Sequence, residues 1–183
     1  REDFIAGVVK DVQSNIPEPE DVFNIRKRFM AEAGFITPTQ VVLLQELERW
    51  NNLVNRMAQS LQDMGRALIG EIGMSDVLED LGNALFNGFL PQMWRSLAPM
   101  TEKPLGSWMV HFQSRFEQYQ SWVESGDPAV IWLSGLHIPE SYLTALVQTT
   151  CRRKLWPLDK SILYTKVTTI TDVSEITEKM EDG

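Results

Sequence analysis

The sequence is poor in the residues that form covalent cross-links and metal cages. It has one cysteine, Cys151, and two histidines, His111 and His137, among 183 residues. A single cysteine excludes an intramolecular disulfide and a zinc cage of several thiolates, and it favours a reducing compartment. The histidines lie far apart, and neither has a cluster of acidic residues around it. The sequence therefore predicts no metal site.

Long apolar runs and an excess of positive charge are absent as well. No apolar run approaches the roughly 20 residues of a membrane helix, which predicts a soluble protein without a membrane partner. Lys and Arg number 17 against 25 Asp and Glu, for a net charge of −8. Such a balance argues against nucleic acid as a partner, because binding it needs many Lys and Arg side chains. The length suits one domain or two small units.

Catalytic signatures are also missing. A phosphate-binding loop needs glycines followed by Lys and then Ser or Thr, and no glycine here precedes a lysine. Ser134 and His137 could be imagined as nucleophile and base, but their spacing matches no nucleophile elbow. The loop Gly70-Glu71-Ile72-Gly73 resembles the nucleotide-gripping loop of KH modules, but its Glu would repel phosphate. We therefore expect no catalytic residue, no bound cofactor and no metal in this chain.

What the sequence does contain is a strong helical pattern. Thr37 as N-cap, Pro38 at the first helical position and Gln40 three residues after the cap predict the start of a helix. That helix is expected to end near Gly70, a suitable C-terminal cap, at a length of roughly 48 Å. Its apolar seam recurs in steps of four and three, with a polar opposite face. The seam consists of Leu43, Leu47, Trp50, Val54, Met57, Leu61, Met64 and Leu68.

Two structures could explain that seam. A free two-stranded coiled coil usually carries charges beside its seam, whereas Glu46 is the only charge at the flanking positions here. A wide apolar stripe without a charged rim favours a long helix inside a bundle. In either case Trp50 should be a buried anchor of the helix.

Other segments predict shorter helices. Two are expected within residues 1–36, and Pro19 can open the second. The basic cluster Arg26-Lys27-Arg28 is interpreted as a solvated helix end, with a phosphate site as the alternative. Further helices should run from Ser75 to Gly88, from about residue 107 to Gly126, and from Pro139 to about residue 155. The β-branched stretch 161–170 is the only good strand candidate, and residues 129–133 could be a strand or a core segment.

The run Ala129 to Thr144 carries a resemblance to a known family. Its residues Trp132-Leu133-Ser134-Gly135, Pro139 and Leu143-Thr144 resemble a signature near the C-terminus of dynein heavy chains. Gln148, the basic run Arg152-Arg153-Lys154 and the run Trp156-Pro157-Leu158-Asp159 are similar to that family in the same order. The resemblance covers roughly residues 37–170, and the residues of these motifs are more similar to those of axonemal than of cytoplasmic heavy chains.

The resemblance implies a division of the chain. Residues 1–36 would be the end of the sixth AAA+ module and its linker, 37–160 the helical part of the C-terminal domain, and 161–183 the first strands of a β part. The fold class would be mainly α, a helical bundle with one long helix, followed by the start of a truncated β subdomain. We therefore expect a piece of a longer polypeptide, α+β in its full-length form.

The resemblance also implies a function that lies in the parent polypeptide. Such a protein is a microtubule motor that hydrolyses ATP and moves toward microtubule minus ends in cilia and flagella. ATP and Mg²⁺ would bind elsewhere in it, and microtubules would be contacted only through other parts. This segment would brace and regulate the AAA+ ring without catalysis, with that ring and the dynein complex subunits as partners, in the cytoplasm and the cytoskeleton of the axoneme.

Two other functions remain compatible with the sequence. One is a stand-alone helical adaptor that binds a partner helix through the Leu43–Leu68 seam. The other is a hydrolase that uses Ser134 and His137. The only support for it is that these two residues are close in the sequence. The basic run Arg152-Arg153-Lys154 has two interpretations as well. Cations at a helix C-terminus are stabilised by the helix dipole, or they could form a salt bridge to a neighbouring domain.

Overall fold

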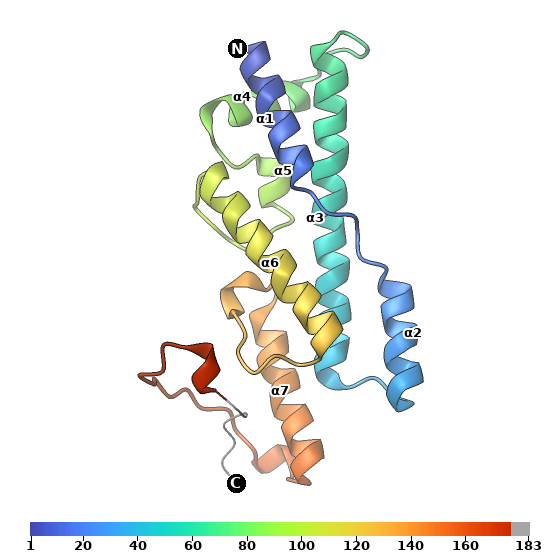
Figure 1. Ribbon diagram of the computed structural model, residues 1–183, viewed down its shortest axis with the longest axis vertical. Helices are drawn as coiled ribbons and strands as arrows, with labels where there is room; N and C mark the ends of the chain where they lie inside the picture. Colours follow the sequence, from blue (N-terminus) through green and yellow to red (C-terminus); the bar gives the residue numbers. More distant parts are fainter. Residues whose placement is uncertain (177–183) are drawn as a thin grey trace. The chain divides into compact units, whose positions relative to one another are not determined.

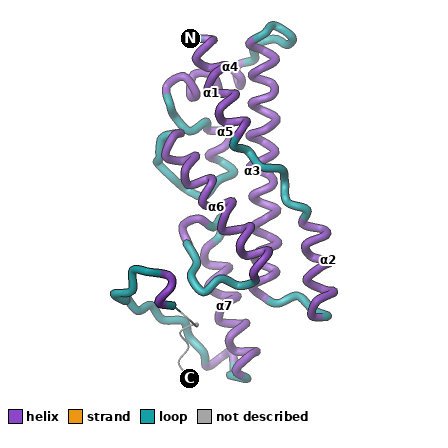
Figure 2. Tube along the Cα trace, in the orientation of Figure 1, coloured by secondary structure: helices purple, strands orange, loops and turns teal. Residues whose placement is uncertain are grey.

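The computed structural model describes residues 1–176 of the chain, and this part is helical (Figures 1 and 2). It holds seven α-helices and no strand, which confirms the predicted mainly α class with one long helix. The α-helices are α1 (Glu2–Ser14), α2 (Val22–Ala33), α3 (Pro38–Leu68), α4 (Asp76–Asn87), α5 (Gln92–Arg95), α6 (Leu105–Ser125) and α7 (Pro139–Lys154). Three short 3₁₀ helices are η1 (Leu133–Gly135), η2 (Leu158–Lys160) and η3 (Val173–Glu175).

The long helix α3 begins where the sequence predicts. The backbone N–H of Gln40 donates to Thr37 Oγ1 over 3.2 Å, and the N–H of Thr37 donates to Gln40 Oε1 over 3.0 Å. This reciprocal capping box satisfies two N–H groups that the first helical turn leaves unpaired. At the other end Gly70 takes a φ of +81°, a conformation that suits glycine after a helix. The 31 residues of α3 span about 46 Å.

The chain divides into two compact units. The first comprises Arg1–Glu20 and Leu47–Phe116, and the second comprises Asp21–Glu46 and Glu117–Gly183. The division falls within both α3 and α6, so each of these helices contributes to the two units. The length of the sequence is compatible with one domain or with two small units, but the sequence did not indicate a division within these two helices.

The core of the first unit is aromatic. Trp50 of α3 is fully buried, as the seam predicts, and stacks on Phe112 of α6 with ring centroids 4.6 Å apart. Trp94 of α5 lies 6.3 Å from Trp108, and its indole N–H donates to the Ser60 hydroxyl over 2.9 Å. Buried Trp N–H groups usually find such a partner. The bond secures α5 to α3 within this unit.

Two further helices of the first unit pack against each other. α1 lies against α4, where Phe4 meets Phe86 edge to face at a centroid distance of 5.6 Å (Figure 1). Gly82 of α4 allows a close approach, because an added Cβ would lie 3.2 Å from the terminal methyl of Met64. The Ser75 cap is confirmed by the N–H of Leu78, which donates to its hydroxyl over 3.2 Å.

The second unit gathers around Asp127, which follows α6. Its carboxylate accepts a hydrogen bond of 2.8 Å from the Thr39 hydroxyl and one of 3.2 Å from the Trp122 indole N–H. Trp122 in turn meets the ring of Tyr142 edge to face, with centroids 5.4 Å apart. The start of α3, the end of α6 and α7 are thereby joined through the buried side chains of Thr39, Trp122 and Tyr142 and the partly exposed Asp127.

Helix α2 corrects a detail of the prediction. It begins at Val22 rather than at Pro19, and Asp21 caps it by accepting a 3.1 Å bond from the N–H of Asn24. An Asp carboxylate at this position satisfies an N–H group of the first turn, which Pro19 cannot do. The basic cluster lies within α2, where the Arg28 guanidinium donates to the carbonyl of Val123 and its Nε lies 3.5 Å from Glu32 Oε1.

The predicted strand is wrong for the described residues. The segment 161–172 has no regular secondary structure, and Ile162 and Val167 are 84% and 93% exposed. A strand needs a neighbour to pair its N–H and C=O groups, and the part of the protein described here holds no other strand. The expectation for residues 177–183 lies outside the described residues. Residues 129–133 are also not a strand: residues 129–132 form a loop, and Leu133 begins η1.

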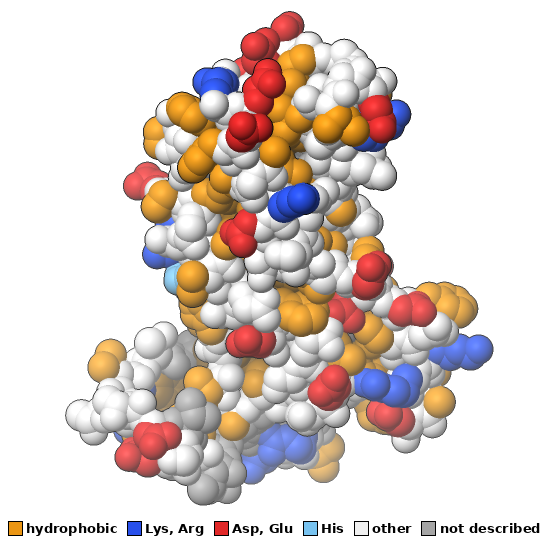
Figure 3. Space-filling model, turned by 45° about the horizontal axis from the view of Figure 1, so that its top comes forward, with side chains coloured by type: hydrophobic (Ala, Val, Ile, Leu, Met, Phe, Trp, Pro, Cys, Tyr) orange, Lys and Arg blue, Asp and Glu red, His pale blue; other side chains and the backbone are white. Residues whose placement is uncertain are grey.

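Apolar side chains also reach the surface. Figure 3 shows them among acidic and basic groups on the visible face. The most exposed large ones on helices include Phe23 of α2 at 73% and Val110 of α6 at 65%. Single exposed apolar residues are normal on a folded protein, and we attach no function to them.

Candidate functional site

A buried carboxylate organises the signature run. Glu46 of α3 is 1% exposed and its Oε1 accepts a 2.8 Å bond from the Tyr119 hydroxyl of α6. The same oxygen accepts a bond of 2.7 Å from the backbone N–H of His137, and Oε2 accepts one of 2.9 Å from that of Ile138. Three donors from two other segments thus surround this carboxylate, as a buried charged group requires.

The start of the signature run is held by a second polar side chain. Gln118 of α6 accepts a 2.8 Å bond from the N–H of Trp132 through Oε1 and donates to its carbonyl over 3.2 Å. The side-chain amide of Gln118 thus pairs with both the N–H and the C=O of Trp132, as a neighbouring strand would, and these two bonds fix the backbone of Trp132.

Close packing explains why the signature has a glycine at position 135. An added Cβ at Gly135 would lie 2.5 Å from the indole ring of Trp132, which is closer than real Cβ atoms come to other atoms. Gly135 is buried in η1, so the ring packs directly on its backbone. Glycine is therefore required here for close packing and not for a positive φ.

The signature residues fall into two groups in the structure. Those before α7 form the loop that Glu46 and Gln118 hold, and Pro139 occupies the first turn of α7. Those after α7 lie on or near the surface around η2, where Leu158 is 53% exposed. The first group is Trp132, Leu133, Ser134, Gly135 and Pro139, and the second is Trp156, Pro157, Leu158 and Asp159. Leu143, Thr144 and Gln148 lie on α7 between them.

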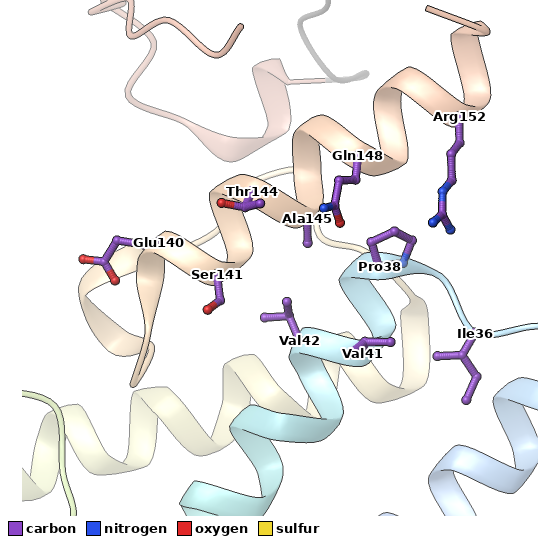
Figure 4. A pocket seen from close by; sticks show the side chains of 10 residues that line it. All are labelled: Ile36, Pro38, Val41, Val42, Glu140, Ser141, Thr144, Ala145, Gln148 and Arg152. Atoms are coloured by element: carbon purple, nitrogen blue, oxygen red, sulfur yellow. The ribbon is translucent and has the colours of Figure 1, made fainter. Parts of the chain in front are cut away.

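A groove opens between one face of α7 and the start of α3 (Figure 4). Its volume is about 470 Å³. The lining residues of α7 recur in steps of three and four, so they share one face of the helix. They are Ser141, Thr144, Ala145, Gln148 and Arg152, with Glu140 at the start of the helix. The opposite wall is apolar and consists of Ile36, Pro38, Val41 and Val42.

The two ends of the groove carry opposite charges. Glu140 stands at its start and Arg152 at its end, about 18 Å apart along the helix at 1.5 Å per residue. Both side chains are exposed, and Arg152 and Gln148 extend from α7 toward Pro38 (Figure 4). Within residues 1–176 the side chains of Arg152 and Gln148 form no hydrogen bond and no ion pair. Their polar groups are thus available to a binding partner.

The surroundings of Tyr142, a buried residue of α7, raise the pKa of its phenol. Burial and the nearby Asp127 carboxylate raise the pKa of Tyr142 to about 12. Both causes disfavour the phenolate, because a buried charge loses hydration and a neighbouring negative charge repels it. Tyr142 therefore stays neutral at physiological pH and serves as a packing residue against Trp122.

The residues considered for catalysis are not brought together into a site. Ser134 is exposed, and the backbone N–H of His137 serves to bind Glu46. Among the described residues no three His, Cys, Asp or Glu side chains gather closely enough to hold a metal ion. The thiol of Cys151 is buried in α7. No helix within residues 1–176 is long and apolar enough to cross a bilayer.

The sequence reasoning missed the polar anchors of this region. Glu46 stood out only as the single charge beside an apolar seam, and that isolation is the signal that could have identified it. Gln118 and Asp127 carry no such signal, because polar residues at those positions of a helix and its end are ordinary. Their roles depend on contacts with residues 14 and 88 positions away.

Comparisons with known proteins span all 183 residues. A family model for the C-terminal domain of the dynein heavy chain matches residues 1–183. The dynein-1-alpha heavy chain of the flagellar inner arm I1 complex of Chlamydomonas reinhardtii is 57% identical over the full sequence. Dynein axonemal heavy chain 10 of Homo sapiens is 52% identical over the full sequence, and the flagellar outer arm dynein beta chain of Chlamydomonas reinhardtii is 37% identical over 88% of it. The chain spans 4% of the length of each relative.

Proposed function

The chain belongs to the family of C-terminal domains of dynein heavy chains, and we propose that it is a non-catalytic module that braces the AAA+ ring of an axonemal motor and regulates its output. The parent polypeptide would be an ATP-driven, minus-end-directed microtubule motor of cilia and flagella. ATP, Mg²⁺ and microtubules would bind to other parts of it. The relatives named above are axonemal or flagellar heavy chains, which supports this location.

One observation carries the proposal. The residues that distinguish the signature run are used for internal packing, with Trp132 on Gly135 and the following backbone bonded to Glu46. A catalytic signature would instead expose a reactive side chain beside its acid or base. The described region instead has a surface groove, between α7 and the start of α3, that could bind another molecule. A folded module with such a surface suits mechanical support.

The adaptor alternative loses its binding surface in this structure. Seven of the eight seam residues are at most 1% exposed, and only Leu68 at the end of α3 is partly accessible. A partner helix would therefore have to displace helices of the same chain. The hydrolase alternative has no support beyond the sequence, because Ser134 is exposed while His137 is held by its backbone at Glu46.

The finer division of the chain stays a prediction. We propose residues 1–36 as the end of the sixth AAA+ module and its linker, 37–160 as the helical part, and 161–183 as the start of a β part. The exposed β-branched side chains of residues 162–170 support the last assignment, since they are suited to a strand once a partner strand is present. The partners proposed are the AAA+ ring of the same heavy chain and other dynein subunits.

The full-length parent heavy chain provides the test. Glu46→Ala, which removes the acceptor for one buried and two partly buried donors, should disturb this module without touching any nucleotide site. We expect altered microtubule-gliding velocity and an altered response of ATP hydrolysis to microtubules. Glu48→Ala, on the exposed face of α3, is the matched control and should leave both unchanged. Unchanged motility in Glu46→Ala, with local unfolding shown by limited proteolysis, would contradict bracing and regulation.

A further inference from the structure

We propose that the groove between α7 and the start of α3 is a docking site for a short amphipathic segment from elsewhere in the parent heavy chain. The segment would place apolar side chains against Pro38 and Val41 and a carboxylate against Arg152. This inference rests on the proposed function and names the surface by which the module would be held.

The shape of the groove suits a peptide segment better than a small molecule. Its walls are one helix face and the first turn of another, and its polar groups lie along the rim and at the two ends (Figure 4). A small-molecule site needs polar groups that converge on one point inside an apolar cavity. A groove about 18 Å long with apolar walls instead fits the recognition of an amphipathic element by spaced apolar anchors.

The charges specify the chemistry of the occupant. Arg152 projects over the apolar wall toward Pro38 and has no ion-pair partner within residues 1–176. A guanidinium at the edge of an apolar surface is well placed to bind a carboxylate by donating two parallel hydrogen bonds. Glu140 at the far end favours a basic or polar residue there. The occupant should therefore carry an Asp or Glu at the end that meets Arg152.

The source of the occupant follows from charge and from length. A second copy is disfavoured, because each copy has a net charge of −8 and copies repel one another at long range. The 183 residues span only 4% of the length of their relatives, so most of a parent heavy chain lies outside them. A segment of the same polypeptide also binds at a high effective concentration and needs only modest contacts.

A photo-cross-linking experiment on the full-length heavy chain tests this assignment. Thr144, an exposed groove residue, would be replaced by the photoreactive residue p-benzoylphenylalanine. After irradiation, mass spectrometry would identify the cross-linked peptide. We expect an intramolecular adduct with a peptide of the parent polypeptide that contains apolar residues and an Asp or Glu.

Charge reversal then separates the groove from general effects on folding. Arg152→Glu should reduce the adduct yield at least about tenfold, since like charges would meet across the contact. A second reversal, of the acidic residue in the captured peptide to Arg, should restore the yield. Lys160→Glu makes the same charge change on an exposed residue outside the groove, and the adduct should persist.

Each other outcome overturns the docking proposal. An adduct to a different polypeptide, no adduct at all, or a yield that Arg152→Glu leaves unchanged would show that this groove does not hold a segment of the parent polypeptide. The result is distinct from the motility test, because the adduct is read without motor activity. Docking in the groove with normal motility in Glu46→Ala would remove the regulatory function and keep the docking site.

Discussion

The phenol of Tyr119 donates a 2.8 Å hydrogen bond to the carboxylate of Glu46, and both side chains are at most 1% exposed. The pair connects α3 with α6 inside one compact unit. The same carboxylate binds two backbone N–H groups just before α7. One buried acid therefore sets the position of the loop that carries the family signature.

Replacing this acid should destabilise the fold. Glu46→Gln keeps the shape but places an NH₂ group opposite one or more of the three donors, and an unsatisfied buried donor costs about 1–3 kcal/mol. We expect that loss in the free energy of unfolding, measured by urea denaturation of the 183-residue protein. Glu48→Gln on the exposed face should change it by less than about 0.5 kcal/mol. Equal effects would show that Glu46 does not organise this region.

Trp50 should be a principal anchor of the aromatic core. Its ring stacks on Phe112 and lies 6.4 Å from Phe116, so Trp50→Ala leaves a large cavity. Such core truncations cost about 3–5 kcal/mol, and the melting temperature should fall strongly in calorimetry. Arg49→Ala, on the neighbouring exposed position, should leave it nearly unchanged. A comparable drop for Arg49→Ala would mean that the wrong face of α3 is assigned to the core.

Gly135 should not tolerate even one methyl group. In Gly135→Ala the added methyl group would displace the Trp132 ring from its position on the Gly135 backbone. Overpacking of this kind lowers the free energy of unfolding by about 1–3 kcal/mol. Near-ultraviolet circular dichroism should report the moved indole, and urea denaturation the lost stability. Gly65→Ala is the control, because it meets no atom within 4 Å in the interior of α3 and should stabilise that helix by up to about 1 kcal/mol. A neutral Gly135→Ala would refute the close packing.

Tyr142 should titrate at strongly alkaline pH. Its pKa of about 12 in the folded protein lies above the ordinary value of 10.0, so the folded state holds the proton more tightly. The associated stability is fully present below pH 10 and is lost as pH rises toward 12. Absorbance at the tyrosinate band should show this late step, and Tyr142→Phe should remove it. Asp127→Asn should move the step to lower pH, because one of its two causes is gone.

The stretch 162–170 should exchange its amide protons quickly in the 183-residue protein. It has no regular secondary structure, and its side chains are mostly exposed. Hydrogen exchange followed by mass spectrometry should find these amides unprotected beside the slow amides of α3. Strong protection that does not depend on protein concentration would show that the stretch is paired within the molecule.

The helices could be predicted because their signals are local. The capping box of Thr37 and Gln40, the Ser75 cap and the glycines after α3, α4 and α6 each act within a few residues. The seam of α3 likewise needs only the helical period to mark a buried face. The strand prediction at 161–170 used the same kind of local preference and failed. β-propensity becomes a strand only when another strand supplies hydrogen-bond partners.

The sequence by itself determined the helical class, the bounds of the long helix, and the family signature with its order of motifs. Only the tertiary structure decided what the signature residues do. That Glu46 binds Tyr119, that Gln118 fixes Trp132 and that Arg152 stands over an apolar groove depend on segments that meet after folding. Such contacts join residues far apart in the sequence through one or two hydrogen bonds each. They leave no periodic trace in the sequence, because a single polar residue on a helix has the same local preferences whether its partner is water or a buried backbone amide.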